Sequence, residues 1–229
     1  MAKTAIMVDG GFYRKRARAL WGDRSPAARA EELYRYAFKH IDKKDGGYPR
    51  ELYRVFYYDC PPVSKNVYHP LTGKSVNFGK APMYGWANGF HDELKAKRKF
   101  ALRMGRLSDN DIYFQLDPAM VKRLCSGKAE ISDLTEDDFR ITFKQKGVDM
   151  KLGIDISSLA FEGTVNQIIL IAGDSDFVPA AKVARRKGID FILDPMGHSI
   201  NSDLMEHIDG LETFVKEDPL SGKKAKHKK

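Results

Sequence analysis

The chain has 229 residues, 42% hydrophobic and 31% charged, and this composition excludes a disordered, fibrous or collagen-like protein. Lysine and arginine exceed aspartate and glutamate by 39 − 31 = 8, which favours a polyanionic partner such as nucleic acid. The longest apolar run, residues 168–172, is far shorter than the roughly 20 residues of a membrane span. The apolar segment before Asp9 is too short for a signal peptide, so we expect a cytoplasmic protein that does not bind membranes.

Apolar or β-branched runs predict the strands, and apolar residues at helical spacing between capping and breaking residues predict the helices. In chain order these patterns predict a strand at 4–8, a tight loop at 9–11, a helix from Ser25-Pro26 to Gly46-Gly47, a strand at 54–58, a long loop at 61–85, a basic helix at about 89–104, a strand at 139–143, a helix at 148–160, a strand at 167–171, a helix at 174–187, a strand at 191–193, a helix at 202–208 and an edge strand at 211–215. Residues 105–140 are ambiguous.

Alternating strands and helices, with short apolar strands, indicate an α/β fold: a three-layer α/β/α sandwich around a mainly parallel sheet. We expect one domain over residues 1–216, with an inserted loop and the basic helix at about 61–106. Residues 217–229 contain five lysines in the last seven positions. They predict a disordered basic tail, which either contacts RNA or only improves solubility.

Carboxylates follow two of the predicted strands and begin one predicted helix. Asp9 follows the first strand, Asp174 and Asp176 follow the strand at 167–171, and Asp149 lies at the start of the helix at 148–160. In parallel sheets ligands bind beyond the carboxyl ends of the strands, so we expect these side chains to meet there. Crowded carboxylates repel one another unless a cation neutralises them, and oxygen ligands suit Mg²⁺ or Mn²⁺. The pattern therefore predicts a divalent-metal site suited to phosphodiester hydrolysis.

Each carboxylate also has a purely structural interpretation. Asp149 and Asp176 stand where helix N-caps are common, and capping alone would explain them. Asp9 and Asp174 are costly to bury without a partner, which favours a functional role. Asp155 can either turn toward the sheet and join the metal ligands or pair with Lys151.

Four motifs occur in order along the chain: IMVDGGFY at 6–13, YYDCPP at 57–62, KGVDMKLGIDI at 146–156 and LIAGDSDFVPAAKVARRKG at 170–188. Together they resemble the NYN-domain family in its LabA-like (DUF88) branch, whose fold resembles the PIN nuclease fold. The resemblance covers roughly residues 4–215. It implies a metal-dependent ribonuclease whose catalytic metal ligands are Asp9, Asp149, Asp174 and Asp176, with Asp155 at a further family-typical position. Many relatives carry an Asn shortly after the first Asp, where this chain has Gly10-Gly11-Phe12.

Two other functions stay open. A noncatalytic RNA-binding or regulatory scaffold would use the same fold. A haloacid-dehalogenase-like phosphatase also has an Asp after its first strand, but its chemistry needs a second Asp two residues later, where this chain has Gly11. The two cysteines, Cys60 and Cys125, are predicted to be reduced and buried, and the six histidines, which form no metal-binding motif, to lie mostly at the surface.

Cations and aromatic residues are concentrated around the predicted basic helix. Single-stranded RNA needs cations for its phosphates and aromatic faces for its bases, which predicts an RNA path here. The alternative is a solvated helix face above core aromatics. The residues proposed for RNA contact are Trp86, Lys95, Lys97, Arg98, Lys99 and Arg103, together with Arg14 and Lys146, which stand close in sequence to Asp9 and Asp149. The sequence leaves a homo-oligomer open.

Overall fold

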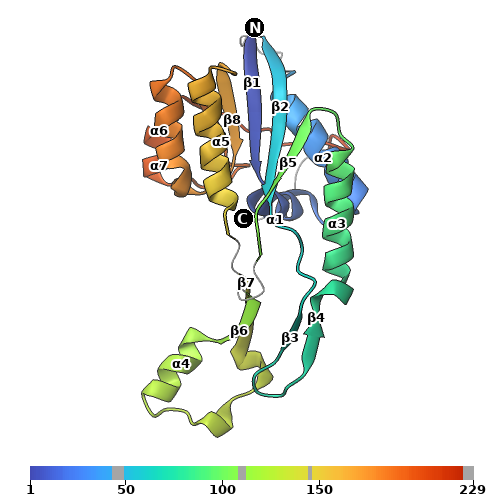
Figure 1. The fold of residues 1–229 in the computed structure, drawn as a ribbon, viewed down its shortest axis with the longest axis vertical. Helices are drawn as coiled ribbons and strands as arrows, with labels where there is room; N and C mark the ends of the chain where they lie inside the picture. The colour runs from blue at the N-terminus through green and yellow to red at the C-terminus, as the bar shows by residue number, and fades with distance from the viewer. Residues whose placement is uncertain (43–48, 108–111, 144–145, 224–229) are drawn as a thin grey trace. The chain divides into compact units, whose positions relative to one another are not determined.

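The computed structural model describes residues 1–42, 49–107, 112–143 and 146–223 (Figure 1). The chain forms two compact units. Unit 1 comprises Met1–Asp59, Gly89–Gly105 and Gly147–Lys229, and unit 2 comprises Cys60–Asn88 and Arg106–Lys146. No helix within the described ranges is long and apolar enough to cross a membrane.

Unit 1 contains a six-stranded sheet in the order β10-β9-β8-β1-β2-β5, with every strand pair parallel. Its strands are β1 (Ala2–Asp9), β2 (Arg50–Asp59), β5 (Phe100–Met104), β8 (Gln167–Ile171), β9 (Asp190–Asp194) and β10 (Gly210–Leu211). Every residue of β8 is buried, as in strands covered on both faces. The predicted α/β fold with a parallel central sheet is thus confirmed.

Helices flank this sheet (Figure 1). They are α1 (Gly10–Trp21), α2 (Pro26–Lys39), α5 (Val148–Glu162), α6 (Val178–Arg186) and α7 (Ser202–Glu206), and a further helix, α3, spans Pro82–Lys95. Ser25 caps α2 as predicted, because its Oγ accepts a hydrogen bond from the Ala28 amide at 3.3 Å. The amphipathic pattern of these helices supplies the apolar faces that the sheet buries.

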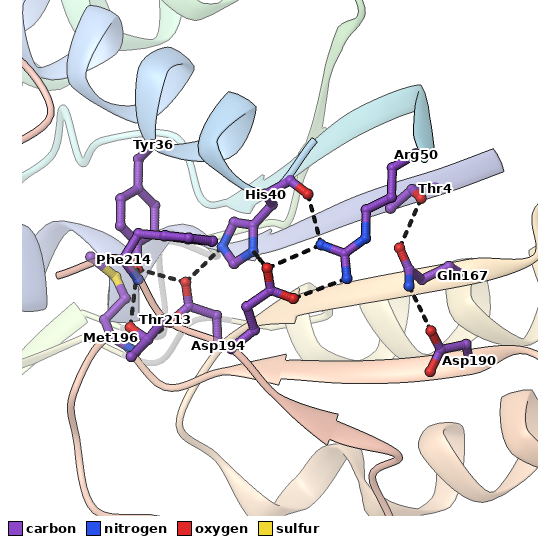
Figure 2. Close-up of polar contacts among 11 residues, drawn as sticks. Thr4, Tyr36, His40, Arg50, Gln167, Asp190, Asp194, Met196, Thr213 and Phe214 are labelled. Atoms are coloured by element: carbon purple, nitrogen blue, oxygen red, sulfur yellow. Dashed lines mark hydrogen bonds and ion pairs between the residues drawn. The ribbon is translucent and has the colours of Figure 1, made fainter. Parts of the chain in front are cut away.

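A buried polar network joins α2 to the end of β9 and the residues that follow it (Figure 2). The Asp194 carboxylate is fully buried, and its Oδ2 accepts a hydrogen bond from the Tyr36 hydroxyl at 2.6 Å and lies 2.8 Å from His40 Nε2. Its Oδ1 accepts from the Met196 amide at 2.8 Å. Arg50, at the start of β2, donates to Glu212 at 2.9 Å and to the His40 carbonyl at 2.7 Å. These contacts satisfy charges whose burial would otherwise be costly.

Unit 2 contains two antiparallel strand pairs, β3 (Asn66–Tyr68) with β4 (Ser75–Asn77) and β6 (Ile112–Leu116) with β7 (Phe139–Phe143), and the helix α4 (Pro118–Cys125). The buried His69 ring packs against Phe114 and Phe139, with centroid distances of 4.6 and 5.0 Å. These half-buried rings cover His69, beside the buried aliphatic residues Val67, Ile112 and Met120.

Several predicted elements are wrong in extent. The chain after Asp9 is helical from Gly10 rather than a tight loop, and the predicted loop at 61–85 contains β3, β4 and the start of α3. The predicted helix at 89–104 ends at Lys95, and Phe100 begins a strand that pairs with β2. Lys99 has φ 64°, a left-handed conformation that a continuous helix cannot contain. The strand at 139–143 exists but pairs with β6, outside the central sheet.

Some burial predictions are also wrong. His40, His69 and His91 are buried, because each contacts a carboxylate or aromatic rings in a core, whereas Cys125 is exposed at the end of α4. The predicted domain limits stay predictions, and residues 224–229 of the predicted tail lie outside the described residues.

Candidate functional site

Two of the predicted site carboxylates are helix caps at neighbouring strand ends. Asp9 ends β1, and its Oδ1 accepts from the Phe12 amide at 3.1 Å at the start of α1. Asp174 follows β8, and its Oδ1 accepts from the Asp176 amide at 3.1 Å at the start of a short 3-10 turn. Because β1 and β8 are adjacent and parallel, both carboxylates lie at the same edge of the sheet.

The capping roles differ from those predicted. The N-cap of α5 is Gly147 rather than Asp149, and the 3-10 turn is capped by Asp174 rather than Asp176. Asp149 lies in the first turn of α5, where a carboxylate interacts favourably with the helix dipole. Asp9 and Asp174, for which the sequence favours a functional role, therefore also cap helical turns. Asp149 and Asp176, which the sequence offers as caps, do not cap a helix.

Two glycines allow close packing around these turns. A Cβ on Gly10 would lie 2.5 Å from Tyr57 Cζ and 2.6 Å from the Tyr58 carbonyl oxygen, and both distances are too short for any side chain. A Cβ on Gly173 would lie 2.5 Å from Cε2 of Phe12, whose ring comes from the first turn of α1. Only glycine fits at position 10, where the clash is with a backbone oxygen, whereas a side chain at position 173 would require the Phe12 ring to move. Packing thus explains why residue 10 is glycine.

The carboxylates act on one another electrostatically. Burial raises the pKa of Asp9, and the nearby charges of Asp149 and Asp59 raise it further, against hydrogen bonds from the Phe12 and Gly11 amides that lower it. Burial also raises the pKa of Asp149, and repulsion from Asp174 and Asp176 adds to this shift. The four predicted site carboxylates therefore form one group of like charges, the arrangement that a bound cation would stabilise.

Asp59 is a fifth carboxylate, which the sequence analysis missed. It ends β2, is 1% exposed, and accepts hydrogen bonds from Arg14 at 2.8 and 3.0 Å. The Tyr57 hydroxyl donates to its Oδ2 at 3.1 Å, and His91 Nε2 lies 3.1 Å from the same oxygen. Its place directly after a strand, in the motif YYDCPP, is the signal that could have identified it. Arg14, predicted to contact phosphate, thus has its charge paired with Asp59.

Asp155 faces β2 and β5 from α5. Its Oδ2 accepts from the Tyr58 hydroxyl at 2.8 Å and from Arg103 Nε at 3.0 Å. Of the two alternatives for Asp155, pairing with Lys151 is wrong, because Lys151 Nζ donates to the Met104 carbonyl oxygen instead. A role for Asp155 as a metal ligand stays a prediction.

Most of the cations predicted to bind RNA already have partners. Lys95 pairs with Asp92 at 2.8 Å and Lys97 with Glu31 at 2.5 Å. Lys99 donates to the Leu52 carbonyl, and Arg103 pairs with Asp155. Arg98 is exposed in the turn before β5, Trp86 is half-buried in α3, and Lys146 is exposed and forms a backbone bridge with Arg106. These cations do not form one helical row, and their contact with RNA stays a prediction.

The donor set fits a hard divalent cation in its chemistry, since every donor is a carboxylate oxygen and the carboxylates repel one another. As the side chains stand, no three acidic, histidine or cysteine side chains in the described ranges form a ready-made metal-binding group. Metal binding would therefore require rotamer changes among these aspartates.

A family model of the NYN domain matches residues 93–210, just over half of the chain. No curated protein and no solved structure matches the chain. The matched residues include α5, β8, α6 and β9, and with them Asp149, Asp174 and Asp176. NYN domains are nuclease-like and act on RNA, and their PIN-like fold agrees with the parallel sheet described above. This chain belongs to the NYN-domain family.

Proposed function

We propose that this protein is a metal-dependent ribonuclease of the LabA-like branch that hydrolyses phosphodiester bonds of single-stranded RNA. The observation that carries the proposal is the group of like charges at the carboxyl edge of an NYN-domain sheet: Asp9, Asp149, Asp174 and Asp176. Structural caps alone do not require such a group, because Asp149 and Asp176 cap nothing and still crowd their neighbours.

In this proposal the four aspartates hold Mg²⁺ or Mn²⁺, and such a cation, when bound, activates water and stabilises developing negative charge. Asp9 and Asp174 are held by their capping hydrogen bonds, so the rotamer changes that metal binding requires would fall mainly on Asp149 and Asp176, which cap nothing. Arg14 keeps N–H groups beyond the two that bind Asp59, and these can contact a phosphate oxygen. Lys146 and the cations around residues 95–103 are proposed as weaker phosphate contacts.

Water rather than the RNA 2′-hydroxyl would be the nucleophile. The products should therefore carry 5′-phosphate and 3′-hydroxyl ends. Mapping of the cleaved ends tests this point, and 2′,3′-cyclic phosphates would exclude the mechanism.

A noncatalytic RNA-binding scaffold is the second candidate. It is favoured by the finding that no ready-made metal group exists among the described residues, and by the capping roles of Asp9 and Asp174. The match to the NYN family model disfavours the phosphatase alternative, and so does Gly11, which stands where that chemistry needs a second Asp.

The decisive experiment incubates the purified protein with end-labelled single-stranded RNA in EDTA, Mg²⁺ and Mn²⁺. We expect cleavage only with a divalent cation and none by the Asp174→Asn variant. Asp137→Asn, an exposed aspartate in unit 2, is the matched control and should cleave normally. Cleavage in EDTA, or unchanged cleavage by Asp174→Asn, would refute the metal assignment.

A further inference from the structure

We propose that single-stranded RNA binds along the groove between α5 and α6, with its bases on the apolar floor and its phosphates on α6. The inference rests on the proposed function for the identity of the ligand. The main RNA path then lies away from the cations at residues 95–103, which the sequence pattern favours.

The groove begins at the candidate site. It has a volume of about 690 Å³, and its walls include Asp149 and Asp176, two of the four site carboxylates. From Asp149 its lining follows α5 to Phe161 and Glu162, a length of about 20 Å at 1.5 Å per helical residue. A strand of RNA whose scissile phosphate lies at the carboxylates would therefore enter this groove directly.

The floor of the groove is exposed and apolar. Met150, Ile154 and Phe161 on α5 are 70%, 55% and 66% exposed, and all three line the groove together with Pro179 and Val183 from α6. Exposed apolar side chains gathered in one hollow mark an interaction site rather than an ordinary surface. Phe161 offers an aromatic face on which an unpaired base can stack.

The cations of α6 point to RNA as the occupant. Lys182 lies three residues after Pro179, and Arg186 and Lys187 lie three and four residues after Val183, so all three neighbour the lining residues on the helix surface. All three are exposed, and within the ranges that the structure describes none forms an ion pair, whereas Arg185 pairs with Asp209.

Lys187 also links the two features of the groove. Its Nζ lies over the Phe161 ring, 4.3 Å from the ring centroid, so the cation covers one face of a ring that is still 66% exposed. A cation for the phosphate beside a ring for the base is the recurring arrangement in sites for single-stranded nucleic acid. Lys95, Lys97 and Arg103 differ, since each already has a carboxylate partner and would have to give it up.

The charged residues that line the groove itself are all acidic, namely Asp149, Asp176 and Glu162, and the cations of α6 lie beside the lining. Asp149 and Asp176 would repel a phosphate unless a cation lies between them, so RNA without a divalent ion should be held by the α6 cations and Phe161. Glu162, at the far end, accepts a hydrogen bond from the Thr164 hydroxyl at 3.2 Å. Apolar floor and unpaired cations together fit RNA better than a purely apolar protein segment does.

The test measures binding of a fluorescent 12-nucleotide single-stranded RNA in EDTA, at several salt concentrations, so that cleavage plays no part. One variant carries Lys182→Gln, Arg186→Gln and Lys187→Gln. Its matched control carries Lys95→Gln, Lys97→Gln and Arg98→Gln, which removes the same charge from the other cluster. We expect the α6 variant to bind RNA at least about tenfold more weakly. Its plot of log K against log salt should also be less steep by about 2, since each of the three lost phosphate contacts contributes about 0.7 to the steepness.

Phe161→Ser tests the stacking contact separately. We expect it to weaken binding roughly tenfold without changing the salt slope, because it removes a base contact and no charge. Ile131→Ser, at an exposed apolar position in unit 2, is its control and should bind normally. Circular dichroism of each variant verifies that it is folded.

The outcomes separate this inference from the proposed function. Equal salt slopes for the two triple variants, or no RNA binding by the parental protein, would overturn the groove as the RNA path. If Phe161→Ser instead changes the sedimentation coefficient of the RNA-free protein and leaves RNA affinity unchanged, the groove is an interface between copies of the chain. RNA that binds through α6 but is never cleaved in Mg²⁺ or Mn²⁺ would refute the ribonuclease and leave the groove assignment standing.

Discussion

Asp59→Asn removes one charge from a buried cluster without changing the size of the side chain. In the parental protein Oδ2 of Asp59 receives Arg14, Tyr57 and His91, and Oδ1 receives the second nitrogen of Arg14. Asparagine keeps one of these oxygens. The NH2 group of asparagine must then face either the second Arg14 nitrogen or the three groups around Oδ2. In both orientations an N–H donor of the asparagine faces another hydrogen-bond donor.

The expected loss follows from the burial of the two partners. Removing one member of a buried ion pair costs about 3–5 kcal/mol. Asp59 is 1% exposed but Arg14 is 27% exposed, so water still reaches the guanidinium and the cost should fall at the lower end, about 3 kcal/mol. For a chain of this size each kcal/mol lowers Tm by about 2–4 °C, which gives a decrease of about 6–12 °C.

Thermal unfolding followed by circular dichroism measures this decrease. Asp203→Asn, an exposed aspartate on α7, is the matched control and should lie within about 0.5 kcal/mol of the parental protein. In the double variant with Arg14→Gln the two losses should not add, because both remove the same pair. A decrease of less than about 1 kcal/mol for Asp59→Asn, or strictly additive losses, would show that the pair contributes little to stability.

Three further predictions follow from the same electrostatics. Asp9→Asn should raise Tm at pH 7 and abolish cleavage. Burial and neighbouring carboxylates raise the pKa of Asp9, so the parental protein loses stability as pH rises through that pKa. In a series of unfolding curves at different pH, the higher stability of the variant should therefore vanish below about pH 4. Burial alone would raise the pKa of Asp218, but the hydrogen bonds from Arg24, the Leu220 amide and Ser221, together with the charge of Arg24, outweigh burial and lower the pKa to about 2. Its contribution to stability should therefore be present above about pH 4 and lost toward pH 2, and Asp218→Asn should flatten the unfolding profile in that window. Deletion of residues 223–229 should weaken RNA affinity in a binding titration and leave the cleavage rate at saturating RNA unchanged, since these residues include no carboxylate; a lower saturated rate would contradict this.

The ends of β1 and β8 were predictable because a strand that is buried on both faces of the sheet has a continuous run of apolar residues. The runs that became β1 and β8 are such segments, and the aspartates that follow them were found for that reason. The pairing of Asp59, which also ends a strand, was not predictable, because its partners Arg14 and His91 are distant in sequence. Only the folded chain reveals that this carboxylate is buried and paired.

The errors around α1 and β5 have a different cause. Gly10 and Gly11 lower helix propensity, which favoured a loop, but the close contact with Tyr57 requires glycine at the first helical position. The segment at 89–104 has apolar residues at helical spacing throughout, and only Lys99 with its positive φ and the pairing of β5 with β2 interrupt the helix. Tertiary contacts decided both cases, and local sequence patterns do not record them.

The position of β1 between β2 and β8 has a consequence for synthesis. Val8 pairs with Ile171, and at about 5–20 residues per second a ribosome needs roughly 8–30 s to add the intervening chain. During that time the edge of β1 that will pair with β8 has unpaired backbone groups, which must be shielded from other chains. For the same reason a fragment limited to residues 93–210, the part that matches the family model, would lack β1 and β2 and leave β8 and β5 without the strands that join them.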